Sequence, residues 1–463
     1  MSRLLQNLMQ FYNLHFPDTV KSVLLYRYRR LDRAREYAKE HGYQGAMFPW
    51  QSGSDGREET QVLHLNPMSG EWGADYSSLQ RHVSLAIAYN IWQYVWISGD
   101  TEFLETYGAE MFLEICRFWA SKASYNEKMG RYEIGKVMGP DEYHEKHPDS
   151  EAGGLKDNSY TNIMVVWAFN RAFEILDSLN ERAREKLAEK INLTEGELET
   201  WGDISKKINI PLSDACTEPC RSNGILEQLD GYFELKELDW EGYRDRYEDI
   251  GRMDRILRAE GKSPDSYKVA KQADALMTFY NLDSGEVAKL LGEAGYLVHD
   301  GFLRRNFDYY LKRTSHGSTL SKMVHSYLAN SVGDRELGWQ LYMDALKSDY
   351  ADVQGGTTKE GIHTGVMAGT AVLALKAYAG LNLDGPRIRI DPCLPAAWRE
   401  VRFNIGFRSD RYYFVVTPES VEVKVDSIRE ETVDVFVRGR RITLASQKWE
   451  TVELNLKFKN SFR

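Results

Sequence analysis

Apolar residues recur every three to four positions through roughly the first 380 residues, a spacing that predicts amphipathic helices. Loops containing glycine or proline separate these segments. The predicted helices cover residues 18–41, 77–96, 101–123, 159–178, 181–190, 266–280, 284–294, 318–331, 335–348 and 361–379. Consecutive helices of this length pair as helical hairpins. We find no fixed repeat period, which favours a closed helical toroid over an open solenoid.

The pattern changes after Gly385, where apolar and polar residues alternate in short runs. Alternation with a period of two predicts strands that bury one face. Segment 437–441, VRGRR, has the composition of a hairpin turn. We therefore predict a boundary near 382–386, with a helical domain at 1–383 and an antiparallel β-sheet domain at 384–463.

The chain is acidic, with 59 lysines and arginines against 69 aspartates and glutamates, a formal charge of −10. This balance disfavours a nucleic-acid or anionic-membrane partner, since binding phosphates requires a local excess of cations. We expect no membrane span, because no run of about 18 apolar residues is present. Four cysteines and an N-terminus without an apolar signal region indicate a cytoplasmic protein. No ligand spacing indicates a metal, and no cofactor is expected.

Aromatic residues make up 12% of the chain, and many stand beside glycine, aspartate or glutamate. Aromatic rings next to polar groups suit a sugar, which offers apolar C–H faces and hydroxyl edges. A large core that uses many aromatic side chains would account for the same composition.

The densest polar segment is Gly139-Pro140-Asp141-Glu142-Tyr143-His144-Glu145. A general acid must be protonated near neutral pH, which a buried site or a neighbouring like charge achieves by raising its pKa. Asp141 is the candidate like charge and Tyr143 a candidate apolar wall. A solvated acidic loop or a calcium-type cluster would explain the same residues.

Three further segments could bind ligands. Residues 314–321, TSHGSTLS, and 357–365, TTKEGIHTG, place hydroxyls, glycine and histidine at helix starts, where free N–H groups bind small anions. Simple helix capping is the alternative. Residues 271–274, KQAD, put a cation and an amide side by side in a mostly apolar predicted helix, which suits hydrogen bonds to sugar hydroxyls.

Taken in order, GPDEYHE, DNSYTN (157–162), KQAD, HGSTLS and EGIHTGVMAGT resemble the inverting disaccharide phosphorylases of glycoside hydrolase family 65, which act on maltose, trehalose or kojibiose. LLYRYRRL (24–31), PWQSG (49–53), NIWQY (90–94) and EQLDGYFEL (227–235) extend the match over nearly the whole chain. The resemblance implies an (α/α)6 toroid followed by a small C-terminal β-sandwich.

The resemblance also implies roles for individual residues. Glu142 matches the general acid, Lys271 and Gln272 match groups that hold the glucosyl unit, and Ser318, Thr319 and His363 match phosphate-binding segments. Trp50, His82 and Asp157 are expected neighbours of the sugar. Inorganic phosphate is then a co-substrate that attacks the anomeric carbon without a base.

One departure from the family concerns the N-terminus, where MSRLLQNLMQ stands in place of a Trp-Asp motif. We therefore expect an N-terminally truncated family member lacking its first barrel helices, able to associate with the missing part or to form a homodimer. Two other functions stay open. One is an inverting hydrolase with Glu142 as acid and Glu360 as base, and the other is a non-catalytic carbohydrate-binding protein.

Overall fold

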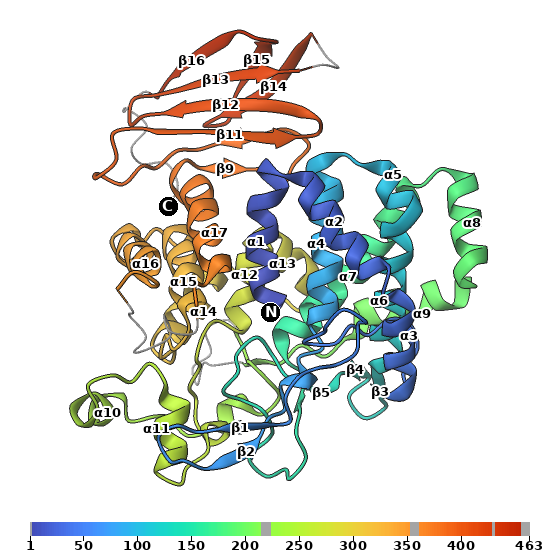
Figure 1. The fold of residues 1–463 in the computed structure, drawn as a ribbon, viewed down its shortest axis with the longest axis vertical. Coiled ribbons are helices and arrows are strands. Elements are labelled where there is room, and N and C mark those ends of the chain that lie inside the picture. The colour runs from blue at the N-terminus through green and yellow to red at the C-terminus, as the bar shows by residue number, and fades with distance from the viewer. Residues whose placement is uncertain (1, 214–223, 352–360, 428–430, 455–463) are drawn as a thin grey trace. The chain divides into compact units, whose positions relative to one another are not determined.

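The computed structural model describes residues 2–213, 224–351, 361–427 and 431–454, which form two compact units. The first unit contains residues 1–3, 24–91 and 104–363, and the second contains 4–23, 92–103 and 364–463. Figure 1 shows a mainly helical chain with a β region at its C-terminal end. The main helices are α1 (Ser2–His15), α2 (Pro17–Tyr28), α3 (Leu31–Glu40), α4 (Val83–Ser98), α6 (Ala109–Lys122), α7 (Ser159–Ser178), α8 (Glu181–Ile191), α9 (Glu195–Lys207), α10 (Trp240–Arg246), α11 (Met253–Ala259), α12 (Ala275–Asn281), α13 (Ser284–Glu293), α14 (Phe302–Leu311), α15 (Thr319–Ser331), α16 (Arg335–Lys347) and α17 (Thr364–Leu373).

Large aromatic side chains fill the core of the first unit. Helix α7 packs against α6 and α9, and Phe169 of α7 stacks on Trp201 of α9 with ring centroids 5.7 Å apart. Trp119 and Trp167 are also almost completely buried. Many of the aromatic residues that the sequence shows are therefore core residues.

Several predicted helices have different boundaries. The segment 77–96 begins with a short 3-10 turn at Ser77–Leu79, and its α-helix, α4, starts only at Val83. The segment 18–41 is divided into α2 and α3 at residues 29–30, where the Arg30 guanidinium donates to the carbonyls of Tyr26 and Ser54. The predicted helix 266–280 is wrong over its first half, since α12 begins only at Ala275. Residues 271–274 lie in a loop whose backbone bonds to other segments, with Ala270 N donating to Arg313 O and Lys271 N to Asp141 Oδ1.

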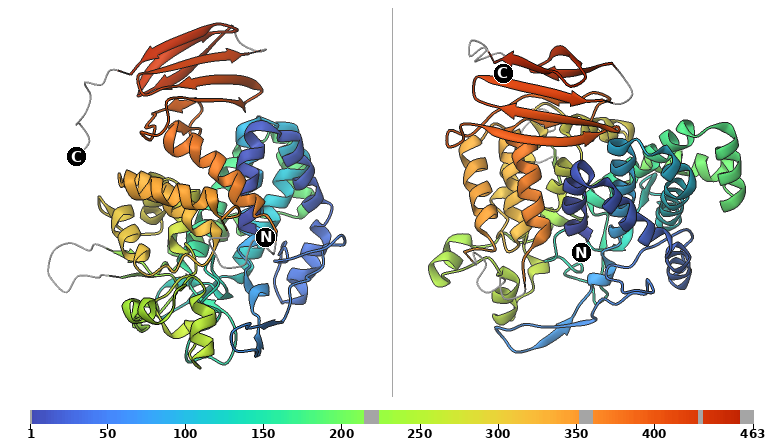
Figure 2. Two further views of the ribbon diagram at one scale, coloured as in Figure 1. Left: turned by 60° about the vertical axis from the view of Figure 1, so that its left-hand side comes forward. Right: turned by 45° about the horizontal axis from the view of Figure 1, so that its top comes forward.

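The second unit contains two four-stranded sheets that share one apolar core. One sheet has the order β15-β14-β10-β9 and the other the order β11-β12-β13-β16. Their strands are β9 (Leu381–Asn382), β10 (Arg389–Ile390), β11 (Val401–Phe407), β12 (Asp410–Val416), β13 (Ser420–Asp426), β14 (Thr432–Val437), β15 (Arg440–Ala445) and β16 (Trp449–Glu453). Alternate residues such as Val421, Val423 and Val425 point into the core, as the period of two predicts. Both views of Figure 2 show the two sheets as layers of a sandwich.

Short hairpins in the long loops of the first unit shape the candidate site. They pair β1 (Leu63–Leu65) with β2 (Trp72–Ala74), β3 (Ser124–Asn126) with β4 (Arg131–Glu133), β5 (Gly135–Val137) with β6 (Leu155–Lys156), and β7 (Leu212–Ser213) with β8 (Ile225–Leu226). The GPDEYHE segment follows directly after β5. Its position is therefore set by a short, hydrogen-bonded strand pair.

Candidate active site

The segment after β5 passes through a tight space that only glycine fits. A Cβ atom at Gly139 would lie 2.2 Å from Asp274 Oδ2 and 2.3 Å from Asn158 Nδ2. These two side chains bond to each other, with Asn158 Nδ2 donating to Asp274 Oδ1 over 2.7 Å. Asp274 Oδ2 in turn accepts from Asp141 N at 2.8 Å. The backbone at Gly139 thus rests on a buried polar pair that also holds the next turn.

Gly139→Ala is expected to lower the free energy of unfolding by about 1–3 kcal/mol, because the added methyl overlaps a packed, buried pair. Urea unfolding measures the change. Gly135→Ala on β5 is the matched control, since no atom of the described residues lies within 4 Å of a Cβ at that position. Equal stability of the two variants would contradict the steric argument.

Asp141 and His144 form a buried pair beneath this loop. Asp141 Oδ1 accepts from Lys271 N at 2.7 Å, and Asp141 Oδ2 lies 3.2 Å from His144 Nδ1 and 3.0 Å from Gln228 Nε2. His144 Nε2 lies 3.0 Å from the carbonyl oxygen of Tyr267. His144 Nδ1 also lies 3.1 Å from Gln228 Nε2. The neighbouring Asp141 carboxylate favours the imidazolium form of the ring. Burial alone would lower the pKa of His144, but the Asp141 carboxylate raises it overall.

This pair changes the interpretation of Asp141. The expected like-charge effect on Glu142 does not describe the arrangement found, because the Asp141 carboxylate is turned into the protein and paired with His144. Tyr143 does form an apolar wall, since its ring is buried in a cluster with Met253, Leu257 and Val269. Asp141 is a positioning group, whereas Glu142 lines the cavity, as do Asp75, Glu145 and Asp254.

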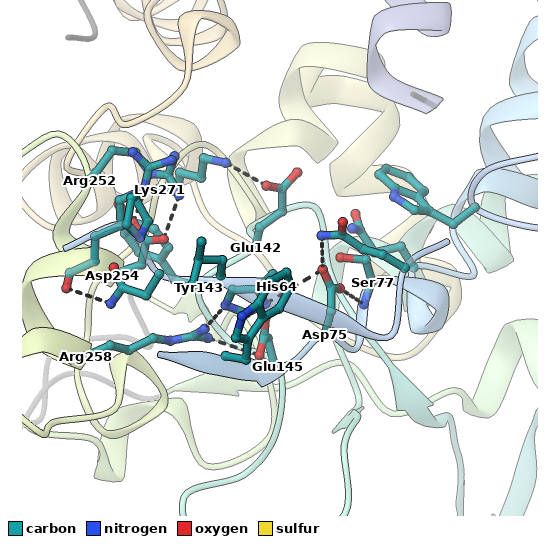
Figure 3. A pocket seen from close by; sticks show the side chains of 18 of the residues that line it. His64, Asp75, Ser77, Glu142, Tyr143, Glu145, Arg252, Asp254, Arg258 and Lys271 are labelled. Atoms are coloured by element: carbon teal, nitrogen blue, oxygen red, sulfur yellow. Dashed lines mark hydrogen bonds and ion pairs between the residues drawn. The ribbon is translucent and has the colours of Figure 1, made fainter. Parts of the chain in front are cut away.

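Glu142 and Lys271 face a cavity of about 610 Å³. Lys271 Nζ lies 2.7 Å from Glu142 Oε2, and Figure 3 shows this ion pair projecting into the cavity from two separate loops. The cavity is large enough for a disaccharide-sized ligand. Trp50 and Trp72 also line it and offer aromatic faces to a sugar.

Gln272, His82 and Asp157, the other predicted sugar-site residues, are not among the residues that line this cavity. Gln272 Nε2 donates to Pro140 O over 3.2 Å, and His82 Nδ1 lies 3.1 Å from Met138 O with its ring 5.6 Å from that of Trp50. Asp157 is fully buried and accepts from Ile134 N, Asn162 Nδ2 and Asn209 Nδ2. Burial raises the pKa of Asp157 to about 6. Gln272 and His82 thus contact the backbone of the loop, and the ring of His82 also contacts that of Trp50.

The hydroxyl-rich segment 314–319 lies against Tyr143. Tyr143 Oη lies 3.0 Å from Ser315 Oγ and donates to Gly251 O over 2.9 Å. A Cβ atom at Gly317 would lie 2.0 Å from Gly251 O, so glycine permits this close approach. Ser318 occupies the N-cap position of α15, and Thr319 is its first residue. The segment therefore reaches the residue next to Glu142.

His363 and Glu360, two residues predicted to belong to the site, precede α17 in the sequence. His363 Nδ1 lies 2.7 Å from Asp349 Oδ1, and His363 N donates to Asp349 Oδ2 over 2.8 Å. The structure thus holds His363 through Asp349. Glu360, the alternative base, lies outside the described residues.

Sequence reasoning missed a group of charged residues in the same cavity. Arg252, Arg255 and Arg258 line it together with His64 and Glu145. The spacing of three along RMDRILR was a usable signal, because residues three apart share one face of a helix. Within the described residues, no group of three or more His, Cys, Asp or Glu side chains is arranged to hold a metal ion.

Glu145 is expected to make stability depend on pH. Burial raises the pKa of Glu145 to about 7 from an ordinary value of 4.5, although Arg258 opposes the shift. A carboxyl with a raised pKa in the folded protein contributes stability below about pH 4.5 that is lost as the pH rises through 7.

Relative to Glu145→Gln, the wild type is therefore expected to lose up to about 3 kcal/mol between pH 4.5 and pH 8. Urea unfolding at several pH values measures this difference, with the exposed Glu127→Gln as control. A wild type whose stability relative to Glu145→Gln stays constant or increases as the pH rises would contradict the assignment.

Comparison with protein families identifies the class of fold and site. Residues 7–372 match the model described as the glycosyl hydrolase family 65 central catalytic domain, and residues 381–444 match the C-terminal domain of the same family. The chain therefore belongs to glycosyl hydrolase family 65, and its fold is an (α/α)6 toroid followed by a β-sandwich.

Individual relatives agree with the family. An uncharacterized glycosyl hydrolase of Mycobacterium tuberculosis is 44% identical over 92% of this chain and 31% of its own length. Trehalose 6-phosphate phosphorylase of Lactococcus lactis is 41% identical over 88% of this chain and 50% of its own length. The solved structure of a putative kojibiose phosphorylase from human microbiome shares the fold, with a TM-score of 0.78 and 24% identity over 99% of this chain and 60% of that chain. The chain thus spans about a third to a half of the length of the curated relatives it matches.

Among the described residues, no helix has the length and apolar character needed to cross a membrane.

Proposed function

We propose that this chain carries the catalytic site of an inverting phosphorylase for an α-glucosyl disaccharide of the maltose, trehalose or kojibiose type. The observation that carries the proposal is the position of Glu142, which faces the 610 Å³ cavity beside Lys271. The family match and the names of the relatives support it, and the relative from Lactococcus lactis adds trehalose 6-phosphate to the substrates worth testing.

In this mechanism Glu142 donates a proton to the glycosidic oxygen while inorganic phosphate attacks the anomeric carbon from the opposite face. The new C–O bond to phosphate forms as the bond to the leaving sugar breaks. The products are β-glucose 1-phosphate and the released sugar. A second carboxylate is unnecessary, because phosphate is already an anion at neutral pH.

Lys271 has a defined place in this cycle. Its ammonium group pairs with Glu142, and an ion pair favours an ionised carboxylate. We infer that Lys271 turns to a bound phosphate or sugar hydroxyl, so that Glu142 can take up the proton it must donate. Ser318, Thr319 and His363 are the proposed phosphate ligands, supported by the contact of segment 314–319 with Tyr143.

The direct test is to incubate the purified chain with maltose, trehalose, kojibiose and trehalose 6-phosphate, with and without inorganic phosphate. Release of β-glucose 1-phosphate that requires phosphate is the expected result. Release of glucose without phosphate would instead indicate a hydrolase and make Glu360 the next residue to replace. No turnover of any substrate would favour a non-catalytic or partner-dependent chain.

A further inference from the structure

The β1–β2 hairpin contributes to the wall of the cavity although its strands have no buried residue of their own. Every residue of β1 and β2 is exposed or partly exposed, and Leu63 and Trp72 are 52% and 67% exposed. Leu65 and Trp72 nevertheless line the cavity. A two-stranded hairpin by itself is at best marginally stable in water. Contacts with other segments must therefore hold the hairpin in place.

Helix α11 provides such contacts. The Arg258 guanidinium donates to Nε2 of His64 on β1. The other ring nitrogen, Nδ1, lies 3.8 Å from Oδ2 of Asp75, which favours a proton on Nδ1 and leaves Nε2 as an acceptor. Burial, together with the charge of Arg258, lowers the pKa of His64 and so favours this neutral ring. Asn66, which follows β1, is buried, and its Nδ2 donates to the carbonyl oxygen of Arg255 over 3.3 Å.

Helix α11 is itself fixed in position by packing. Its apolar residues lie in one cluster with Tyr143, the neighbour of Glu142, and are at most 2% exposed; they are Met253, Ile256 and Leu257. Arg258 follows Leu257 directly but lines the cavity. The hairpin is therefore bound to a side chain that extends from a well-packed helix beside the proposed acid.

Arg258 also contacts the loop that carries Glu142. Its guanidinium lies 3.1 Å from Oε2 of Glu145, three residues after Glu142, and Figure 3 shows Arg258 extending to both His64 and Glu145. The backbone of Glu145 is held as well, since its N–H donates to Asp265 Oδ1 over 2.8 Å. A guanidinium carries several N–H donors in one plane, so it can make both contacts at once. Arg258 thus links the hairpin to the loop of the proposed acid.

We propose that Arg258 is a positioning residue, which holds the β1–β2 hairpin at a fixed distance from the Glu142 loop and so sets the width of the cavity for the sugar. This inference rests on the proposed function and adds to it a residue that governs sugar binding. Arg258 acts through the hairpin, whereas Glu142 and inorganic phosphate act on the reacting atoms. Loss of Arg258 should therefore weaken sugar binding and leave the chemical step nearly unchanged.

Steady-state kinetics of Arg258→Met test this separation with maltose, trehalose, kojibiose or trehalose 6-phosphate, whichever the chain cleaves. KM for that disaccharide should rise about 10–100-fold, the effect of losing one or two hydrogen bonds of a charged group. We expect kcat and the KM for inorganic phosphate to change by no more than about threefold. Arg258→Lys should recover part of the loss, because its ammonium can still contact Glu145. Arg304→Met, which alters an exposed arginine on α14, is the matched control.

Hydrogen exchange without any sugar measures the position of the hairpin directly. In Arg258→Met the amides of residues 61–75 should exchange at least about tenfold faster than in the wild type, while those of α11 keep their rates. His64→Leu removes the other partner of the same bond and leaves α11 and Glu145 intact, so it should accelerate exchange in the same residues. This second variant decides the question if Arg258→Met fails to fold.

The inference would be overturned by unchanged hairpin exchange in both variants, or by faster exchange that includes α11 in both. A fall in kcat at constant KM would also overturn it, because Arg258 would then act in the chemical step. Phosphorolysis with the same KM in wild type and variants would reject the inference and keep the proposed function. If the chain cleaves no substrate, the proposed function fails, and the exchange rates alone decide whether Arg258 positions the hairpin.

Discussion

Glu142→Gln is expected to reduce phosphate-dependent release of β-glucose 1-phosphate by about 10³–10⁴-fold, because glutamine cannot donate a proton to the leaving oxygen. The amide has nearly the same size as the carboxyl group and can still face Lys271. The fold should therefore be unaffected, and the loss should appear mainly in kcat. Initial rates at saturating disaccharide and phosphate measure it.

A substrate with a better leaving group provides the decisive control. A dinitrophenyl α-glucoside needs little protonation of its leaving oxygen, so Glu142→Gln should retain far more activity on it than on a disaccharide. Exposed Glu127→Gln should behave as wild type on both. An equal loss on both substrates would show that Glu142 binds or positions the sugar without acting as the acid.

Asp141→Asn is expected to lower the free energy of unfolding by about 3–5 kcal/mol, because it leaves the His144 imidazolium buried without its counter-charge. The pKa of His144 is raised in the folded protein. Stability from the pair is therefore fully present below the ordinary value of 6.5 and is lost as the pH rises through the folded pKa. The gap between wild type and variant should narrow toward alkaline pH.

Urea unfolding across that pH range, with the exposed Asp177→Asn as control, measures the effect. A double variant that adds His144→Gln should recover part of the loss, since no buried charge then remains. Additive losses in the double variant would mean that the two residues act independently. Asp141→Asn should also reduce activity, because Asp141 holds the backbone of Lys271.

Local pattern was sufficient for many individual elements. The predicted helix 159–178 has the bounds of α7, and 181–190 and 335–348 differ from α8 and α16 by one residue at the C-terminal end. Their strong caps explain this agreement, since Asn158, Asn180 and Asp334 each accept a hydrogen bond from the first turn. Helix 266–280 failed where backbone groups bond to distant segments, which a local period cannot reveal.

For the candidate site, too, the sequence predicted one part and the fold decided another. GPDEYHE, KQAD and HGSTLS identified the residues from which Glu142, Lys271 and the segment at Tyr143 come. Glu142 and Lys271 are 129 residues apart in the sequence, and Tyr143 and Ser315 are 172 apart. These separations say nothing about the direction of the side chains or the distance between them. Only the folded chain turns Asp141 inward to His144, leaves Glu142 at the cavity and brings Lys271 within 2.7 Å of it.

By itself the sequence determined the family, the succession of helices and strands, and the segments that carry the polar chemistry, because these depend on local periodicity and ordered motifs. Tertiary structure decided which side chains face the cavity. It gave Asp157, His82 and Gln272 their hydrogen-bond partners and brought Arg255, Arg258 and His64 together in the lining of one cavity. The physical reason is that burial and pairing of charge depend on packing between distant segments.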